Sequence, residues 1–99
     1  MSEKKSVEEF KNEIDTAPWA LLEDHYKRGA LFIIDKKLKL EEVANAFSRD
    51  YSDIVKIWLD NKEIQIVDED LSKKLAQNPH DKVASFVIVQ PYVLIQLLD

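Results

Sequence analysis

The sequence contains no cysteine, one glycine and two histidines. Without cysteine the chain has no disulfide, no thiolate nucleophile and no cysteine-ligated zinc or iron–sulfur cluster. The single glycine, Gly29, excludes glycine-rich phosphate loops and the G-x-S-x-G nucleophile elbow, because both need several glycines for positive φ or close backbone approach. His25 and His80 lie far apart and have no further His or Cys ligands at a fixed spacing. We therefore expect no metal site and no cofactor.

The chain also has fewer basic than acidic residues: it contains 14 lysines and arginines and 19 aspartates and glutamates, so its formal net charge is −5. An acidic chain repels a phosphate backbone unless its cations gather on one face. A chain of 99 residues with 45% hydrophobic residues suits one domain, residues 1–99, with a modest core. Its first ten residues lack the apolar segment of a signal peptide, so we expect a cytoplasmic protein.

Amphipathic spacing predicts two helices in the first third of the chain. Residues 3–15 form the first, which we expect to lie at the periphery of the domain. Thr16 is suited to cap the second, with Pro18 in its first turn, where a missing N–H costs little. Gly29 stands where a left-handed helix end is needed.

A pair of helices is predicted in the middle of the chain, at residues 40–50 and 51–62. Asp50 is suited to cap the second helix. The expected inner face of that second helix comprises Tyr51, Ile54, Val55 and Trp58.

Short runs rich in Val, Ile and Phe predict strands at residues 30–35, 63–67 and 84–90. Residues 68–79 begin with acids and have a thin apolar face, so they predict a weak helix that stops before Pro79.

The chain closes on its longest apolar run, VASFVIVQPYVLIQLLD (residues 83–99). A transmembrane helix needs about 20 apolar residues, and Pro91 with its neighbouring glutamine interrupts a shorter run, so no membrane span is expected. Because proline cannot donate a ladder hydrogen bond, we expect the strand at residues 84–90 to lie at an edge, bend or break at Pro91. Residues 92–97 then form a second strand or an apolar arm.

From residue 18 the expected order is helix, strand, helix, helix, strand, weak helix, strand. Without the weak helix this is the element order of a winged helix, and the central pair has helix-turn-helix spacing. We predict an α+β domain: a winged-helix-like helix-turn-helix with a small β-sheet of three to four strands and an extra N-terminal helix. Another small α+β arrangement is the alternative.

Five stretches carry a resemblance to known proteins: TAPW (residues 16–19), RGALFIID (28–35), LKLEEVANAF (38–47), DYSDIVKIWL (50–59) and VIVQPYVLIQ (87–96). Together they resemble a family of short bacterial proteins, domain of unknown function 2288, over about residues 13–97. Most of these residues are of the core-forming type, so the resemblance implies a fold and no particular activity. Tyr92 stands where the family pattern has tryptophan.

The basic residues concentrate in one segment, at Lys27, Arg28, Lys36, Lys37 and Lys39. If residues 30–35 form a strand, its length separates the first two from the others by about 25–30 Å along the chain. We interpret them as a solvated helix end and a solvated loop, and as the candidate contacts of any phosphate ligand. The charges of residues 49–62 sum to zero, whereas sequence-specific DNA readers offer arginine or lysine. Nucleic-acid binding is therefore the less favoured function.

No carboxylate pair or serine in the sequence has the setting of a catalytic group, so we expect no enzyme. A long apolar C-terminus in a small domain favours a protein partner, because an uncovered apolar edge is usually an interaction site. We predict a non-catalytic protein-interaction module, homodimeric through its C-terminal strand, with a winged-helix-like nucleic-acid-binding or regulatory protein as the alternative. The candidate interface residues are Phe86, Tyr92, Leu94 and Leu97.

Overall fold

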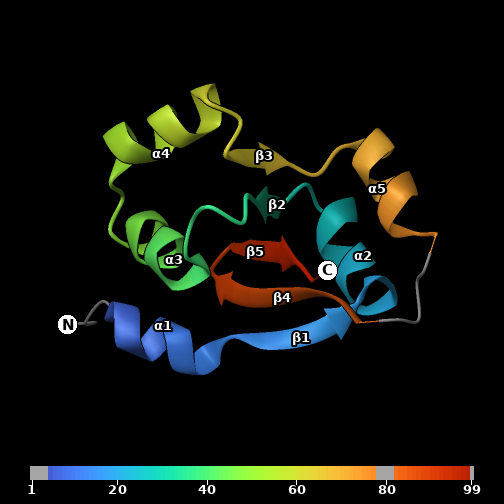
Figure 1. Ribbon diagram of the computed structural model, residues 1–99, viewed down its shortest axis with the longest axis horizontal. Helices are drawn as coiled ribbons and strands as arrows, with labels where there is room; N and C mark the ends of the chain where they lie inside the picture. The colour runs from blue at the N-terminus through green and yellow to red at the C-terminus, as the bar shows by residue number, and fades with distance from the viewer. Residues whose placement is uncertain (1–4, 78–81, 99) are drawn as a thin grey trace.

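The computed structural model describes residues 5–77 and 82–98, which form five helices and five strands. In chain order the elements are α1 (Val7–Glu13), β1 (Asp15–Pro18), α2 (Trp19–Lys27), β2 (Leu31–Ile34), α3 (Leu40–Ser48), α4 (Ser52–Asp60), β3 (Ile64–Ile66), α5 (Glu69–Leu75), β4 (Lys82–Val89) and β5 (Tyr92–Leu97). The strands make one mixed sheet of order β1-β4-β5-β2-β3 (Figure 1). The expected small sheet of three to four strands is therefore a five-stranded one.

Strand β5 lies in the middle of this sheet. It pairs antiparallel with β4, where Val87 stands opposite Leu94, and parallel with β2, where Phe32 stands opposite Leu94. The apolar run does break at Pro91, which follows a cis peptide bond and turns the chain from β4 into β5. Of the alternatives for residues 92–97, the second strand is correct, but both of its edges are hydrogen-bonded within the chain. The C-terminal strand therefore offers no free edge to a partner.

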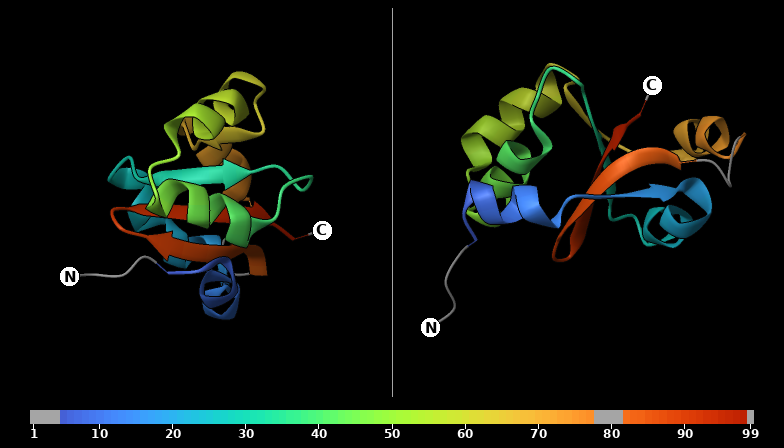
Figure 2. Two further views of the ribbon diagram at one scale, coloured as in Figure 1. Left: turned by 90° about the vertical axis from the view of Figure 1, so that its left-hand side faces the viewer. Right: turned by 60° about the horizontal axis from the view of Figure 1, so that its bottom comes forward.

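Helices cover both faces of the sheet, as the two turned views show (Figure 2). One core cluster joins Phe10 of α1 and Val43 of α3 to Ile64 and Leu94 of the sheet. The other joins Trp19 of α2 and Leu75 of α5 to the opposite face. The continuous Val- and Ile-rich strands are those expected of a sheet buried on both faces, with one cluster on each side.

This layering differs from a winged helix. In the structure α2 packs with α5 on one face of the sheet, whereas α3 and α4 lie on the other (Figure 2). A winged helix needs its first helix packed against the helix pair. Element order alone could not distinguish these arrangements, because it does not say on which face of a sheet a helix lies.

Local sequence explains where several elements begin. Ser6 and Glu9 form a reciprocal capping box at the start of α1. Asp68 caps α5 by accepting a hydrogen bond from Leu71 N–H, which gives the expected weak helix a defined start. Asp50 does not cap α4, because its φ of 57° places it in the turn before Tyr51.

Residues 15–18 form strand β1 and not the capped start of a helix. Thr16 N–H bonds to the carboxylate of Asp15, and α2 begins after Pro18 without a side-chain cap. Pro18 fixes an extended φ of −75° that suits an edge strand as well as a first helical turn. The sequence signal at these residues was therefore ambiguous, and the strand was missed.

Gly29 ends α2 as predicted, with φ of 71°. Its N–H bonds to Tyr26 O, and Ala30 N–H bonds to His25 O. These two bonds are the Schellman motif, which satisfies the last carbonyls of a helix and requires a left-handed residue. None of the helices formed by residues 5–77 and 82–98 is long and apolar enough to cross a bilayer.

Candidate functional site

Helix α4 exposes an unusually apolar surface. Five of its nine residues are Ile, Val, Trp or Leu, yet the helix has no buried residue. Ile57 is 55% exposed, Leu59 41% and Ile54 40%. On a surface helix such residues normally form one stripe that faces the core. Here the apolar residues cover a wider arc of the helix than the surface by which α4 contacts the rest of the domain. The apolar residues at the edges of that arc are therefore exposed to solvent.

A hollow of about 240 Å³ lies on one flank of α4, between the helix and the sheet. We call it the α4 groove. Val55 and Leu59 line it from the helix, and Tyr51 lines it from the turn before the helix. Phe32, Phe47 and Tyr92 line it from β2, α3 and β5, and Ala46, Asp50 and Ser52 complete the lining.

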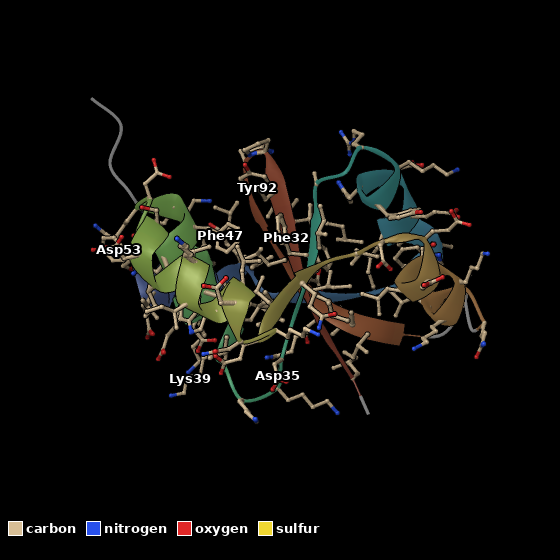
Figure 3. The ribbon with its side chains drawn as sticks, turned by 90° about the horizontal axis from the view of Figure 1, so that it is seen from above. Phe32, Asp35, Lys39, Phe47, Asp53 and Tyr92 are labelled. Atoms are coloured by element: carbon tan, nitrogen blue, oxygen red, sulfur yellow. The ribbon has the colours of Figure 1, made fainter. Side chains whose placement is uncertain are left out.

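The three aromatic rings of the α4 groove form a mutually packed triad. The Phe32 and Phe47 centroids are 5.5 Å apart, Phe32 and Tyr92 are 5.6 Å apart, and Phe47 and Tyr92 are 5.8 Å apart. All three pairs meet edge to face, an arrangement that favours aromatic pairs. Figure 3 labels these three rings, which lie near one another between the helices and the strands. The triad therefore gives the groove a fixed apolar lining.

Exposed apolar side chains concentrate on α4 and the segments beside it, and three of them line the α4 groove. Nine large hydrophobic residues are exposed among the residues that the structure describes, and six of them lie on α4, on the turn before it, or on the neighbouring strands β3 and β5. We call these six the α4 patch: Tyr51, Ile54, Ile57, Leu59, Ile66 and Tyr92. Such a concentration on a small domain is typical of an interaction surface.

The basic residues do not form a single patch. Lys27 and Arg28 lie at the end of α2, before β2, whereas Lys36, Lys37 and Lys39 follow β2. Strand β2 therefore separates the two groups, as expected from its length, and Figure 3 shows Lys39 and Asp35 together beyond one end of that strand. No described feature brings the groups together.

Local hydrogen bonds hold Arg28 and the loop that carries Lys36, Lys37 and Lys39. Arg28 donates from Nη2 to His25 Nδ1 at 2.8 Å, so this ring nitrogen accepts the hydrogen bond. In the loop after β2, Lys37 N–H bonds to Asp35 Oδ1 at 2.8 Å. Gln96 Nε2 donates to the carbonyl oxygens of Asp35 and Leu38, at 3.0 and 2.7 Å, and so fixes the loop to β5.

The residues expected at a C-terminal interface have different environments. Leu94 is completely buried in one core cluster. Phe86 and Leu97 are partly buried and pack against the other cluster. Tyr92 is 39% exposed and lines the α4 groove. Of the four, Tyr92 alone belongs to an exposed apolar surface.

The described residues contain no group of three or more His, Cys, Asp or Glu side chains placed to hold a metal ion. His80 lies outside the described residues.

Two further hollows border the turn between β4 and β5. One of about 800 Å³ extends from Tyr92 to Lys5 and Glu13, which form an ion pair of 2.7 Å. The other, of about 250 Å³, includes His25 and Arg28.

Sequence patterns placed Val55 and Trp58 correctly, since both are half-buried and Trp58 packs against one core cluster, but misplaced two other residues. Tyr51 and Ile54 were expected on an inner face and are 51% and 40% exposed. Leu59 was not singled out. The sequence did indicate exposed apolar residues on α4, because five of its nine residues are apolar, more than one buried stripe of a helix contains.

Two comparisons relate this chain to known proteins. Residues 5–97 match the family described as protein of unknown function (DUF2288). The chain is also similar to the NMR solution structure of PA1075 from Pseudomonas aeruginosa, with 33% identity and a TM-score of 0.81. That similarity covers 100% of this chain and 92% of the other. No curated protein matches the sequence.

The family match extends over nearly the whole chain and includes every element from α1 to β5. It agrees with the resemblance carried by the five sequence stretches, and the solved structure supports the α+β architecture. The chain belongs to the DUF2288 family of proteins of unknown function.

Proposed function

We propose that this protein is a non-catalytic interaction module that binds an apolar segment of a partner protein in the α4 groove. The observation that carries the proposal is the α4 patch, which holds six of the nine exposed large hydrophobic residues among those described; three of the six, Tyr51, Leu59 and Tyr92, line the aromatic-lined hollow. Interaction energy concentrates on aromatic and aliphatic anchors that fill such pockets. The surface lies on α4 and beside β5, and not along the backbone edge of the C-terminal strand.

The size of the α4 groove favours side-chain anchors over a small-molecule ligand. Its volume of about 240 Å³ is below the roughly 300–1,000 Å³ typical of small-molecule and cofactor sites. A hollow of this size suits one or two large side chains inserted from a partner. The rest of the partner segment then lies along the exposed flank of α4.

Charge at the groove indicates which end of the partner segment should be basic. Asp50 is the charged residue of the lining, and Asp53 lies beside it near the start of α4. Both side chains are exposed, so a lysine or arginine of the partner could approach them without a large desolvation penalty. The expected partner is an apolar segment with a basic residue at that end.

A random peptide library selected against the purified protein tests the proposal. We expect enriched peptides to combine large apolar residues with lysine or arginine. Leu59→Lys should weaken their binding by roughly ten-fold or more, because it places a solvated cation in the groove. Fluorescence anisotropy of a labelled selected peptide measures the affinity.

Leu21→Lys is the matched control, because Leu21 is 68% exposed on α2, a helix of the opposite sheet face. It should leave peptide affinity unchanged. Circular dichroism establishes that both variants fold. Equal binding to both variants, or a selection without apolar enrichment, would refute the assignment of the α4 groove.

The alternative, nucleic-acid binding, has no specific observation in its favour. Helix α4 is the second helix of the predicted helix-turn-helix pair, and its exposed residues include Asp53, Lys56 and Asp60 beside large hydrophobic side chains. The basic residues stand in two groups at opposite ends of β2. An electrostatic footprint for a phosphate backbone would need them on one face.

A further inference from the structure

The two edge strands of the sheet differ in how they are protected. Along β1, Thr16 N–H is bonded to the Asp15 carboxylate at 2.8 Å, the register shifts between Ala17 and Pro18, and Pro18 has no N–H. Side-chain bonds, irregular register and proline are the usual means of blocking an edge. Strand β1 is therefore a closed edge.

Strand β3 is short, at three residues, but it has no proline and no shift of register. Asp35 N–H bonds to Glu63 O and Val67 N–H bonds to Leu31 O, so residues 63, 65 and 67 face β2. By the alternation of an antiparallel ladder, the backbone groups of Ile64 and Ile66 face outward. Neither residue has another backbone partner among the described residues. Figure 1 shows β3 as the outer strand, with no strand beyond it.

We propose that β3 is a self-association edge, at which two copies of this chain pair antiparallel about Gln65 and join their sheets. In this register Ile64 of one copy exchanges both backbone hydrogen bonds with Ile66 of the other, and the two Gln65 residues form the pair without hydrogen bonds. The outward N–H and C=O groups of β3 in one copy thus form hydrogen bonds with those of the other copy. A two-fold axis makes the contact identical for both copies.

Charge complementarity supports a second copy as the occupant. The register centred on Gln65 brings Lys62, in the turn before β3 of each copy, near Asp68, the residue that caps α5 of the other. The Lys62 side chain has no ion-pair partner among the residues described. Asp68 uses Oδ1 to cap α5, which leaves Oδ2 for a cation. The chain is acidic overall, so two copies need such an opposite-charge register to approach.

Apolar contacts agree with the same register. Ile66 is 49% exposed and shares a sheet face with the buried Ile64. Pairing about Gln65 places Ile66 beside Ile64 of the other copy on one face, which continues the apolar row from Phe32. Ile66 belongs to the α4 patch but does not line the α4 groove, whose Tyr92 end is two strands away from the joined edge.

A single engineered cysteine tests the pairing, because the chain contains none. The two Gln65 Cα atoms should lie about 4.5 Å apart, within the roughly 4.4–6.8 Å that a disulfide spans. We expect Gln65→Cys to form a covalent dimer in oxidised glutathione. Thr16→Cys, on the closed edge, is the matched control and should remain largely monomeric under the same conditions.

Charge exchange provides a second test. Lys62→Asp and Asp68→Lys each place like charges near one another, so each variant alone should dimerise about ten-fold more weakly than the unaltered chain. An equimolar mixture restores opposite charges at both positions and should recover the dimer. Aspartate also suits the φ of 61° at residue 62.

Analytical ultracentrifugation measures the charge-exchange variants, and circular dichroism shows whether Asp68→Lys retains α5 after losing its cap. If Asp68→Lys does not fold, the cysteine pair decides alone. Equal crosslinking of Gln65→Cys and Thr16→Cys, or a wild-type chain that sediments as a monomer at high micromolar concentration, overturns the proposal. Leu59→Lys should leave the Gln65→Cys crosslink intact, so a failure of the groove proposal is distinguishable from a failure of this one.

Discussion

Replacement of Leu94 by alanine should strongly destabilise the fold. Leu94 is completely buried, lies in the central strand and stands opposite residues of both neighbouring strands. Large-to-small substitutions at such sites cost 2–5 kcal/mol, and we expect about 3 kcal/mol here. Total stability of a domain is only about 5–15 kcal/mol, so the loss is a large share.

Urea denaturation followed by circular dichroism measures the effect. With an m-value of about 1–1.5 kcal/mol/M, the midpoint should fall by about 2–3 M while m itself stays constant. Leu98→Ala is the control, because Leu98 follows β5 and is 43% exposed; it should cost less than about 1 kcal/mol. A Leu94→Ala variant no less stable than Leu98→Ala would refute the central position of β5.

Two further substitutions test local features of the fold. Gln96→Ala removes the amide that donates to the carbonyl oxygens of Asp35 and Leu38, and it should destabilise the chain by about 1–3 kcal/mol. Gln77→Ala, at an exposed position, should change stability by less than about 0.5 kcal/mol in the same urea titration. Gly29→Ala meets open space but must adopt a φ of 71°, so it should cost about 1–2 kcal/mol from backbone strain alone. Gly29→Asn should cost less in thermal melts, because asparagine tolerates this conformation, and an alanine variant as stable as the wild type would contradict the motif at the end of α2.

Local sequence patterns predicted most of the helices and strands but few of the contacts between them. The helices α2 to α5 and the strands β2 to β4 lie within or close to their expected ranges, because apolar periodicity and turn residues are local signals. Strand β1 was missed because Thr16 and Pro18 also suit a helix start. The order of the strands in the sheet could not be predicted from local patterns, because pairs such as Phe32 and Leu94 join distant parts of the chain.

The candidate site was less predictable than the fold. Its lining comes from four separate elements, β2, α3, α4 and β5, which only the tertiary structure brings together. The excess of apolar residues in α4 was visible in the sequence, but the usual assumption that such residues face the core concealed it. Tyr92, Leu94 and Leu97 were all predicted as interface residues; Tyr92 is exposed, whereas Leu94 is buried and Leu97 is half-buried.

The central position of β5 has a consequence for biosynthesis. Among the described elements β5 is the last to be made, yet it joins the β1–β4 side of the sheet to the β2–β3 side. Until it emerges, the nascent polypeptide holds two sheet fragments with open inner edges, which are exposed to premature association. Cotranslational folding should therefore remain incomplete until the ribosome has released this segment, and stalled chains lacking it should depend on chaperones.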